Sequence, residues 1–599
     1  MTSTADRDAD RAVQLGAARL TVNDVVDVAR DGRAVASLGP QATQAVEATA
    51  AWVAQTIDQI AEARAAGATP PAYYGINTGF GAMAGRSALS SRYLAQALGR
   101  NLVASHAVGA GPMFDEEVVR ATLLIRAQSL AQGYSGVRPL VVDTLVRMLN
   151  AGVYPAVPEQ GSLGASGDLA PLAHILLVMS APPTPGSDDV DLGQDPTDGE
   201  AFVRQPTDQP AGAAHLHLTE AYRGGQTLWR RVPGAEAMAA IGGKIDLHAK
   251  EALALLNGAT VSAAVGALVV RDARNLLRNA ELAVAMSLEG VRGFRDPFFP
   301  NVHRARGHAA ALETAGAVLA HVEGSELLDP GDLATNPRRV PPQDPYCLRC
   351  APQVLGSVAD TLDLASRWVE MDINAATDNP LIFLDLERDY KTLSGGNFHG
   401  EPIAMAMDFL GIAATEIANT SDRRMFTLCD YHPETAAAGQ DPRRDLGHGL
   451  SSFLIDEPAG TAGLNSGLMM LQATAAALVS DCKALAHPDS VDSIPSSGNQ
   501  EDHVSMSLNA ARHARQIVRN AEQVIALEFL CAAQAIALQL AKPGMAGARL
   551  GAGTGAAYAA IRAAGIAPLV QDRVLQADIH AALRMVRSGT LVAAAQRPR

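Results

Sequence analysis

The stretch GSLGASGDLAPLAH, residues 161–174, joins a glycine-rich turn to an apolar helix. Asp168 is of a residue type that commonly caps helix N-termini, and Pro171 falls in the tolerant first helical turn. The three glycines before the helix predict a tight turn. The stretch therefore predicts a loop that leads directly into a buried helix capped by Asp168.

The turn contains the tripeptide Ala165-Ser166-Gly167, which can undergo a reaction within its own main chain. A strained turn brings the Gly167 amide nitrogen onto the Ala165 carbonyl carbon, and glycine permits this approach because it has no Cβ. Loss of one water from the resulting ring and of another from Ser166 leaves an exocyclic methylidene on an imidazolone. The tripeptide therefore predicts a strong electrophile that forms without an external cofactor.

The composition of the whole chain favours helices around this turn. Of 599 residues, 48% are apolar and 19% charged, which excludes disorder across the whole chain. Aromatic residues make up only 4% and alanine is abundant, a balance that favours helix over sheet. Apolar residues recur at helical spacing between irregular loops. We expect an all-α fold, a large elongated helical bundle whose N-terminal loop-and-helix portion carries the tripeptide.

Three parts follow one another along the sequence. Residues 1–18 are polar and predict a flexible tail, and residues 19–250 form the portion that carries the tripeptide. Within that portion, residues 181–214 are acidic and rich in proline, which predicts an exposed, flexible insertion. Residues 251–599 predict a bundle of long helices followed by C-terminal helices.

Charge and cysteine content exclude several functional classes. The net charge of −15 argues against a nucleic-acid or anionic-membrane partner. Five cysteines are too few for a disulfide scaffold, and Cys347 and Cys350 lack the second pair that a zinc site needs, so no metal is expected. The N-terminus lacks the apolar core of a secretory signal, and residues 252–270 contain too many small polar residues for a membrane span. We expect a cytoplasmic protein.

Further motifs carry a resemblance to a known family. The further blocks are YGINTGFG (74–81), LALLNG (253–258), QDPYCLRCAPQ (343–353), SGGNFHGEP (394–402) and SVDSIPSSGNQEDHVSM (490–506). Together with GSLGASGDLAPLAH, these blocks resemble those of the aromatic amino acid ammonia-lyase and aminomutase family, in which the tripeptide forms a 4-methylidene-imidazol-5-one (MIO) group. The resemblance covers roughly residues 70–180 and 220–540, and six such blocks in this order exclude chance agreement.

The resemblance implies roles for two residues near the tripeptide. Tyr74 matches the base that removes the substrate's β-proton, and its pKa of about 10 must be lowered by neighbours for this work; packing of a lid loop is the alternative. Tyr73 has no matching role and is interpreted as packing. Asn257 matches the residue that hydrogen-bonds the MIO ring, and a buried asparagine in an apolar helix requires such a partner.

Four more residues match positions around the substrate. Gln343 and Tyr346 correspond to positions beside the MIO group and the substrate. Arg349 corresponds to the arginine that binds the substrate carboxylate, for which a planar guanidinium is suited; a structural salt bridge is the alternative. Phe398 corresponds to an aromatic residue that lines the site.

Two positions bear on the choice of substrate. Ser105-His106 resembles the pair of histidine ammonia-lyases and of some tyrosine aminomutases. Glu501 resembles the glutamate of histidine enzymes, where tyrosine and phenylalanine enzymes typically have glutamine. A carboxylate can pair with an imidazole, whereas against a phenyl ring it is a desolvated charge without a partner. Both positions favour histidine.

The resemblance thus implies a histidine ammonia-lyase that converts L-histidine to trans-urocanate and ammonia, as a homotetramer whose active sites take residues from three chains. A tyrosine or heteroaromatic ammonia-lyase or 2,3-aminomutase of the same family is one alternative. A catalytically silent helical scaffold is another. Residues 425–463 are unlike the usual segment and leave the substrate open.

Overall fold

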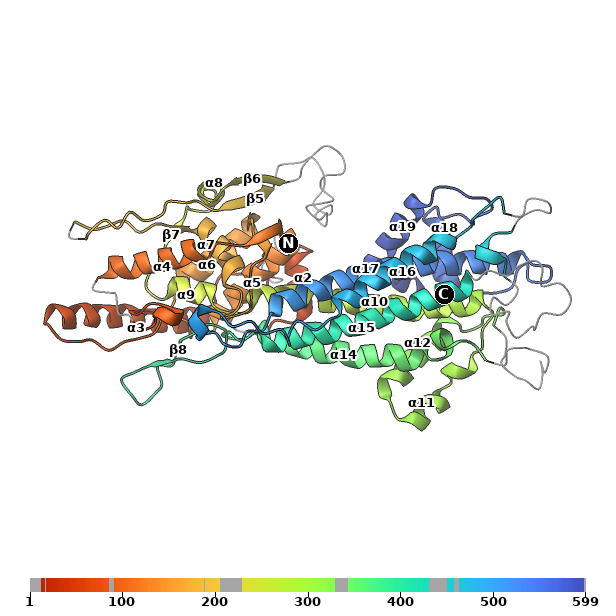
Figure 1. Cartoon of the computed structure of the whole chain (residues 1–599), viewed down its shortest axis with the longest axis horizontal. Coiled ribbons are helices and arrows are strands. Elements are labelled where there is room, and N and C mark those ends of the chain that lie inside the picture. Colours follow the sequence, from red (N-terminus) through yellow and green to blue (C-terminus); the bar gives the residue numbers. More distant parts are fainter. Residues whose placement is uncertain are drawn as a thin grey trace, which may run out of the picture. The chain divides into compact units, whose positions relative to one another are not determined.

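The computed structural model describes residues 12–16, 18–85, 91–187, 189–204, 229–328, 343–429, 450–456 and 463–596. These residues are predominantly helical, and their strands form four small sheets (Figure 1). The expected all-α class is confirmed. The chain divides into two compact units, the first made of residues 1–271, 366–408 and 488–512, and the second of residues 272–365, 409–487 and 513–599.

Four long helices contribute residues to both units. They are α10 (Thr260–Gly290), α14 (Ala351–Asp372), α15 (Glu401–Leu428) and α17 (Ser507–Ala541). Because each of these helices passes from one unit into the other, the units are discontinuous in sequence. The sequence interpretation instead divided the chain into contiguous parts at residue 250.

The first unit holds the glycine-rich turn. Its core helix α5 (Glu116–Ala131) is buried from Val118 to Ala131 and packs against α2 and α6. The other elements of the unit are α2 (Val22–Ala29), α3 (Pro40–Ala65), η1 (Gly81–Met83), α4 (Arg92–His106), β1 (Ala110–Met113), α6 (Pro139–Ala151), β2 (Val153–Pro155), β3 (Pro158–Gln160), α7 (Leu169–Met179), β4 (Ser180–Ala181), β5 (Glu200–Arg204), β6 (Trp229–Pro233), α8 (Gly234–Ala239), β7 (Ile245–Asp246), α9 (Glu251–Leu256), β8 (Leu381–Ile382), β9 (Thr392–Leu393) and η6 (Ser497–Asn499).

Part of the expected insertion belongs to a sheet. Strand β5 lies between β2 and β6, antiparallel to both, and Phe202 pairs with Tyr154 and Arg231. Strand β5 contains three consecutive apolar residues, one of them the fully buried Ala201, and such a run favours a strand. The acidic, proline-rich residues before β5 hid that signal. Residues 205–214 of the expected insertion lie outside the described residues.

The packed chain begins before residue 19. Val13 and Leu15 are buried, and Val13 forms a β-bridge with Val35. The last residues of the segment expected as a tail thus contribute apolar side chains to the first unit, while residues 1–11 lie outside the described part.

The second unit is held by a buried polar cluster. The Glu528 carboxylate accepts hydrogen bonds from Ser287 of α10, from Ser421 of α15 and from both Nε and Nη2 of Arg424, at 2.6 to 2.7 Å. The other elements are η3 (Asp296–Phe298), α11 (Pro300–Arg306), α12 (Ala309–His321), α13 (Tyr346–Arg349), η5 (Ser452–Leu454), α16 (Met469–Leu485), α18 (Ala552–Ala563), α19 (Gln576–Arg587) and α20 (Thr590–Ala595). Of the divergent segment 425–463, residues 430–449 and 457–462 lie outside the described residues.

One described helix, α17, passes a test of length and apolar composition for crossing a membrane. Most of its apolar window is buried inside the protein. The segment 252–270 is likewise buried, in α9 and the first turns of α10.

Candidate active site

The loop with the tripeptide lies between β3 and α7 and is folded tightly against the segment after α9. Gly164 and Gly167 both have positive φ, and the Gly167 amide donates to the Gly164 carbonyl at 3.4 Å. A Cβ on Gly167 would lie only 2.0 Å from the carbonyl carbon of Gly258. Only glycine therefore fits at position 167, as the ring-forming reaction requires.

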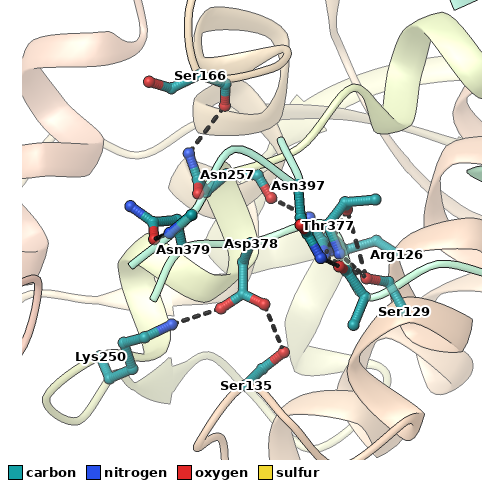
Figure 2. A network of polar contacts seen from close by, with 12 residues as sticks. Arg126, Ser129, Ser135, Ser166, Lys250, Asn257, Thr377, Asp378, Asn379 and Asn397 are labelled. Atoms are coloured by element: carbon teal, nitrogen blue, oxygen red, sulfur yellow. Dashed lines mark hydrogen bonds and ion pairs between the residues drawn. The ribbon is translucent and has the colours of Figure 1, made fainter. Parts of the chain in front are cut away.

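Two donors converge on the carbonyl oxygen of Ser166. Asn257 Nδ2 donates to it at 2.9 Å (Figure 2), and the Gly258 amide donates at 3.1 Å. Asn257 follows α9 and is only 3% exposed, and its Oδ1 is buried without a hydrogen-bond partner among the described residues. The expected contact between Asn257 and the tripeptide is therefore present in the chain before any ring has formed. This arrangement fits an MIO group.

Asp168 occupies the N-cap position of α7, but its side chain makes no hydrogen bond there. Its carboxylate instead accepts from Ser162 Oγ at 2.9 Å and from the amide and hydroxyl of Ser262, near the start of α10, at 2.7 and 2.9 Å. The expectation that Asp168 caps the helix of residues 169–180 is wrong, because the amide and hydroxyl of Ser262 bind its carboxylate instead. Burial raises the pKa of Asp168, and these hydrogen bonds oppose that rise.

Tyr74 lies half-buried on the glycine-rich loop that precedes η1. Its hydroxyl accepts a hydrogen bond from the Gly81 amide at 3.4 Å. Burial raises the pKa of Tyr74; the Gly81 hydrogen bond lowers it, and the negative charge of Glu501 raises it further. The expectation that neighbours lower this pKa is therefore not met within the described chain.

Two contacts tie the tyrosine loop to its surroundings. A Cβ on Gly75 would lie 2.3 Å from Leu253, one turn of α9 before Asn257. Tyr73 stacks on Tyr390 with 4.7 Å between ring centroids, which confirms that it is a packing residue. The loop is thus packed against the helix that leads to Asn257.

Glu501 lies beside the same loop, brought there by contact between η1 and η6. A Cβ on Gly81 would be 3.8 Å from Glu501 Oε1, while Oε2 accepts a hydrogen bond from Ser496 Oγ at 2.8 Å. The residue expected to recognise the substrate ring and the residue expected to remove its proton therefore both lie close to Gly81.

The remaining expected residues of the first unit lie on α4 and before α15. The His106 ring is held through Nδ1, 2.8 Å from the Leu102 carbonyl and 3.0 Å from Ser105 Oγ, at the C-terminal end of α4. Phe398 is half-buried, two residues before Gly400.

Ser505 and Ser507 connect the Phe398 segment to the tripeptide loop. A Cβ on Gly400 would lie 2.5 Å from Ser507 Oγ, and a Cβ on Gly164 would lie 2.2 Å from Ser505 Oγ. The segment with Phe398 and the loop with the tripeptide therefore pack against the same two serines.

Gln343, Tyr346 and Arg349 belong to the second unit. Tyr346 begins α13 and is 72% exposed, and the Arg349 guanidinium lies 4.4 Å from the centroid of its ring. Arg349 Nε is buried without a hydrogen-bond partner among the described residues. These residues give Arg349 no structural salt bridge, and its planar guanidinium is suited to a carboxylate ligand.

Comparison with known proteins identifies the family of this chain. The model of the aromatic amino acid lyase family matches residues 20–563. The chain belongs to the aromatic amino acid lyase family.

Relatives within this family cover nearly the whole chain. Histidine ammonia-lyase of Caldanaerobacter subterraneus subsp. tengcongensis is 41% identical over 573 residues, 96% of each chain. The solved histidine ammonia-lyase of Trypanosoma cruzi has a TM-score of 0.76 at 31% identity, covering 98% of this chain and 95% of that one. The tyrosine aminomutase of Streptomyces globisporus has a TM-score of 0.79 at 31% identity, covering 97% and 98%.

Sequence interpretation missed one residue in contact with the site. Arg126 of α5 is fully buried and donates to the main-chain carbonyl of Asn257 at 2.6 Å. The available signal was an arginine within the apolar run LLIRAQSLA (123–131), where a charged side chain cannot reach water.

Proposed function

We propose that this protein is a cytoplasmic histidine ammonia-lyase that converts L-histidine to trans-urocanate and ammonia. The observation that carries the proposal is the convergence of Asn257 and Gly258 on the Ser166 carbonyl within a loop that admits only glycine at position 167. The relatives named histidine ammonia-lyase, at about 41% identity, support the choice of substrate.

The MIO group, formed from Ala165-Ser166-Gly167, would supply an electrophilic carbon that takes up the substrate amine and turns it into a better leaving group. The residues around it would hold this ring. Asn257 and Gly258 bind the Ser166 oxygen through two donors. The unpartnered Asn257 Oδ1 is an acceptor for an N–H group brought by the substrate or the ring.

Tyr74 and Glu501 would act on the rest of the substrate. Tyr74, as the phenolate, takes the β-proton, and Glu501 beside it orients the imidazole through a charge-assisted hydrogen bond. An aromatic substrate without a ring N–H would leave the Glu501 carboxylate desolvated and unpaired, which disfavours phenylalanine.

We further propose that Arg349 binds the substrate carboxylate and that Gln343, Tyr346 and Arg349 reach the site from another chain of a homotetramer. The support is that these residues lie in the second unit, whereas the tripeptide, Asn257 and Glu501 lie in the first. Exposed Tyr346 is available for such a contact.

The proposal is tested by giving the purified protein L-histidine, L-tyrosine and L-phenylalanine separately, with Ser166→Ala as control. We expect urocanate and ammonia from histidine, no product from Ser166→Ala, and an intact mass of the wild type that is lower by two waters than the sequence mass. Normal turnover by Ser166→Ala or an unmodified mass would refute the MIO site.

The second candidate is a tyrosine 2,3-aminomutase or ammonia-lyase. It is favoured by Ser105-His106 and by the structural likeness to a tyrosine aminomutase. Its signature is β-tyrosine or coumarate from tyrosine, so separation of unsaturated acids from β-amino acids in the same incubations distinguishes the two candidates.

A further inference from the structure

Arg126 is a buried arginine that contacts the segment behind the tripeptide loop. Its Nη1 donates to the Asn257 carbonyl at 2.6 Å, and its Nη2 donates to Ser129 Oγ at 2.6 Å (Figure 2). Longer contacts join the guanidinium to two further hydroxyls, those of Thr260 at 3.3 Å and Thr377 at 3.4 Å. All of these groups belong to the first unit.

No carboxylate of the described residues makes a hydrogen bond or ion pair with this guanidinium. Asp378, whose charge acts on Arg126, is itself bound to buried Lys250 and to Ser135 Oγ (Figure 2). Burial lowers the pKa of Arg126 to about 10, and Asp378 opposes this change. The arginine is therefore still protonated at neutral pH. A buried charge without an ionic partner is costly, and its retention calls for a reason.

One peptide unit connects this charge to the tripeptide. The carbonyl of the Asn257–Gly258 peptide accepts from Arg126, and the amide of the same peptide donates to the Ser166 oxygen at 3.1 Å. Hydrogen bonds linked in this way polarise one another, so a cation on the carbonyl makes the amide a stronger donor.

Close neighbours leave Gly258 little freedom to move. A Cβ on Gly258 would lie 2.4 Å from Thr377 Oγ1 and 3.0 Å from Arg126 Nη1. A Cβ on Gly167 would in turn lie 2.0 Å from the carbonyl carbon of Gly258. The guanidinium, Gly258 and the tripeptide loop therefore form a continuous series of close contacts.

We propose that Arg126 is a positioning residue that polarises the Ser166 carbonyl oxygen through the Asn257–Gly258 peptide. The inference rests on the proposed MIO chemistry. In the ring this oxygen is conjugated with the methylidene carbon, so electron density moves onto it when a nucleophile adds. It also takes up charge when the Ser166 Cα proton leaves during loss of the second water. Arg126 thus favours both formation of the electrophile and its use.

The test compares Arg126→Lys and Arg126→Met with Arg120→Lys. Arg120 lies on the same helix, is also buried, and donates to the Val28 carbonyl at 2.6 and 3.0 Å and to the Tyr154 hydroxyl, away from Asn257. Three quantities are measured: the loss of two waters by intact mass, the rate at which 2-mercaptoethanol adds to the protein at Ser166, and kcat with KM for histidine.

We expect Arg126→Met to lower both the rate of thiol addition and kcat by about 100-fold. Arg126→Lys should lower both rates by about 10-fold. For comparison, removal of a donor that binds an oxyanion directly lowers kcat by about 100- to 1000-fold. KM should stay within about twofold, and Arg120→Lys should match the wild type in all three quantities. Folded Arg126 variants that retain both waters while Arg120→Lys loses them also support the proposal. Thiol addition and kcat equal to those of Arg120→Lys would overturn it.

Ser129→Ala covers the case in which the Arg126 variants do not fold. It removes one anchor of the guanidinium and leaves the arginine in place, and a several-fold loss of kcat and thiol addition at unchanged KM is expected. No change in either rate would overturn the inference. A wild-type protein without the loss of two waters instead refutes the proposed function, before any variant is compared.

Discussion

At the scale of single residues, the site couples recognition of the substrate to the strength of the base. Glu501 and Tyr74 both lie close to Gly81, and the carboxylate that would attract an imidazole also raises the pKa of the phenol. A group that pairs with Glu501 weakens the effect of the Glu501 charge on the pKa of Tyr74. The substrate ring therefore assists its own deprotonation by neutralising the charge beside the base.

Replacement of Glu501 by glutamine should change both properties. Histidine turnover should fall by at least about tenfold, more than any tyrosine turnover, because the imidazole loses its ionic partner. The value of kcat/KM should rise with pH as Tyr74 loses its proton. In Glu501→Gln this rise should occur at lower pH, because removal of the negative charge lowers the pKa of Tyr74 in the free enzyme. The measurement is the pH profile of kcat/KM on both substrates.

Ser496→Ala is the matched control for this variant. It removes the hydroxyl that binds Glu501 but keeps the carboxylate. Histidine turnover should therefore fall, while the pH at which kcat/KM rises should not change. If kcat/KM of Glu501→Gln rises at the same pH as that of the wild type, the electrostatic coupling between Glu501 and Tyr74 is contradicted.

At the scale of elements, buried charges fix how the helix ends meet around the tripeptide. Lys250 stands at the N-cap position of α9 with positive φ, and its ammonium pairs with Asp378 where neither side chain is exposed. This pair holds the start of the helix that ends at Asn257. The position of Asn257 is thus determined at both ends of α9, by Lys250 and by Arg126.

Asp378→Asn should destabilise the protein by about 3–5 kcal/mol, because it leaves the Lys250 ammonium buried without an ionic partner. The change is measured as a shift of the midpoint in chemical denaturation. Asp58→Asn removes the carboxylate of an exposed pair with Arg92 and should leave the midpoint nearly unchanged. Equal shifts for the two variants would contradict the interpretation of the buried pair.

Asp372, the last residue of α14, should make stability depend on pH. Burial raises its pKa from an ordinary value near 3.8 to about 7, so the folded state binds a proton that the unfolded state releases. Stability from this group is present below about pH 4 and is lost as the pH rises through about 7. Asparagine stays neutral at every pH and avoids the charge at a helix C-terminus.

Asp372→Asn should therefore be more stable than the wild type by about 1–3 kcal/mol at pH 8 and nearly equal to it at pH 4. Thermal unfolding of both proteins across this pH range measures the difference. A stabilisation of the same size at both pH values would show that packing, and not ionisation, distinguishes the two side chains.

At the scale of the whole molecule, the proposed shared site predicts complementation. Ser166→Ala and Arg349→Ala chains should each be inactive alone. Co-expressed, they should recover about a quarter of wild-type activity, because about a quarter of the sites then draw both intact residues from different chains. The activity of purified mixed tetramers, isolated with two different affinity tags, measures this recovery. Activity no higher than that of the separate variants would mean that one chain supplies both residues.

Much of the fold and the local site could be predicted from sequence, because helical periodicity and loop motifs are local signals. The all-α class and the tight turn at Gly167 are present in the structure. The contact of Asn257 with the tripeptide, which the resemblance to the family implied, is present as well. The contact of Arg126 with Asn257 could not be predicted, because the apolar run around Arg126 indicates burial but its acceptor comes from a distant segment.

Two other differences have the same physical origin. Asp168 precedes one helix but binds the start of α10, since the nearest donors in space are not those nearest in sequence. Strand β5 depends on partners at Val153–Pro155 and Trp229–Pro233, which local composition does not contain.

The back-to-back contact of Gly167 with Gly258 has a consequence for anyone who wishes to redesign this protein. In a mutagenesis library that randomises either position, nearly all variants cannot form the tight loop. The exposed residues beside Glu501, Gln500 and Asp502, carry no such restriction. Diversity directed there, with the two glycines left constant, samples new substrate preferences while the electrophile is retained.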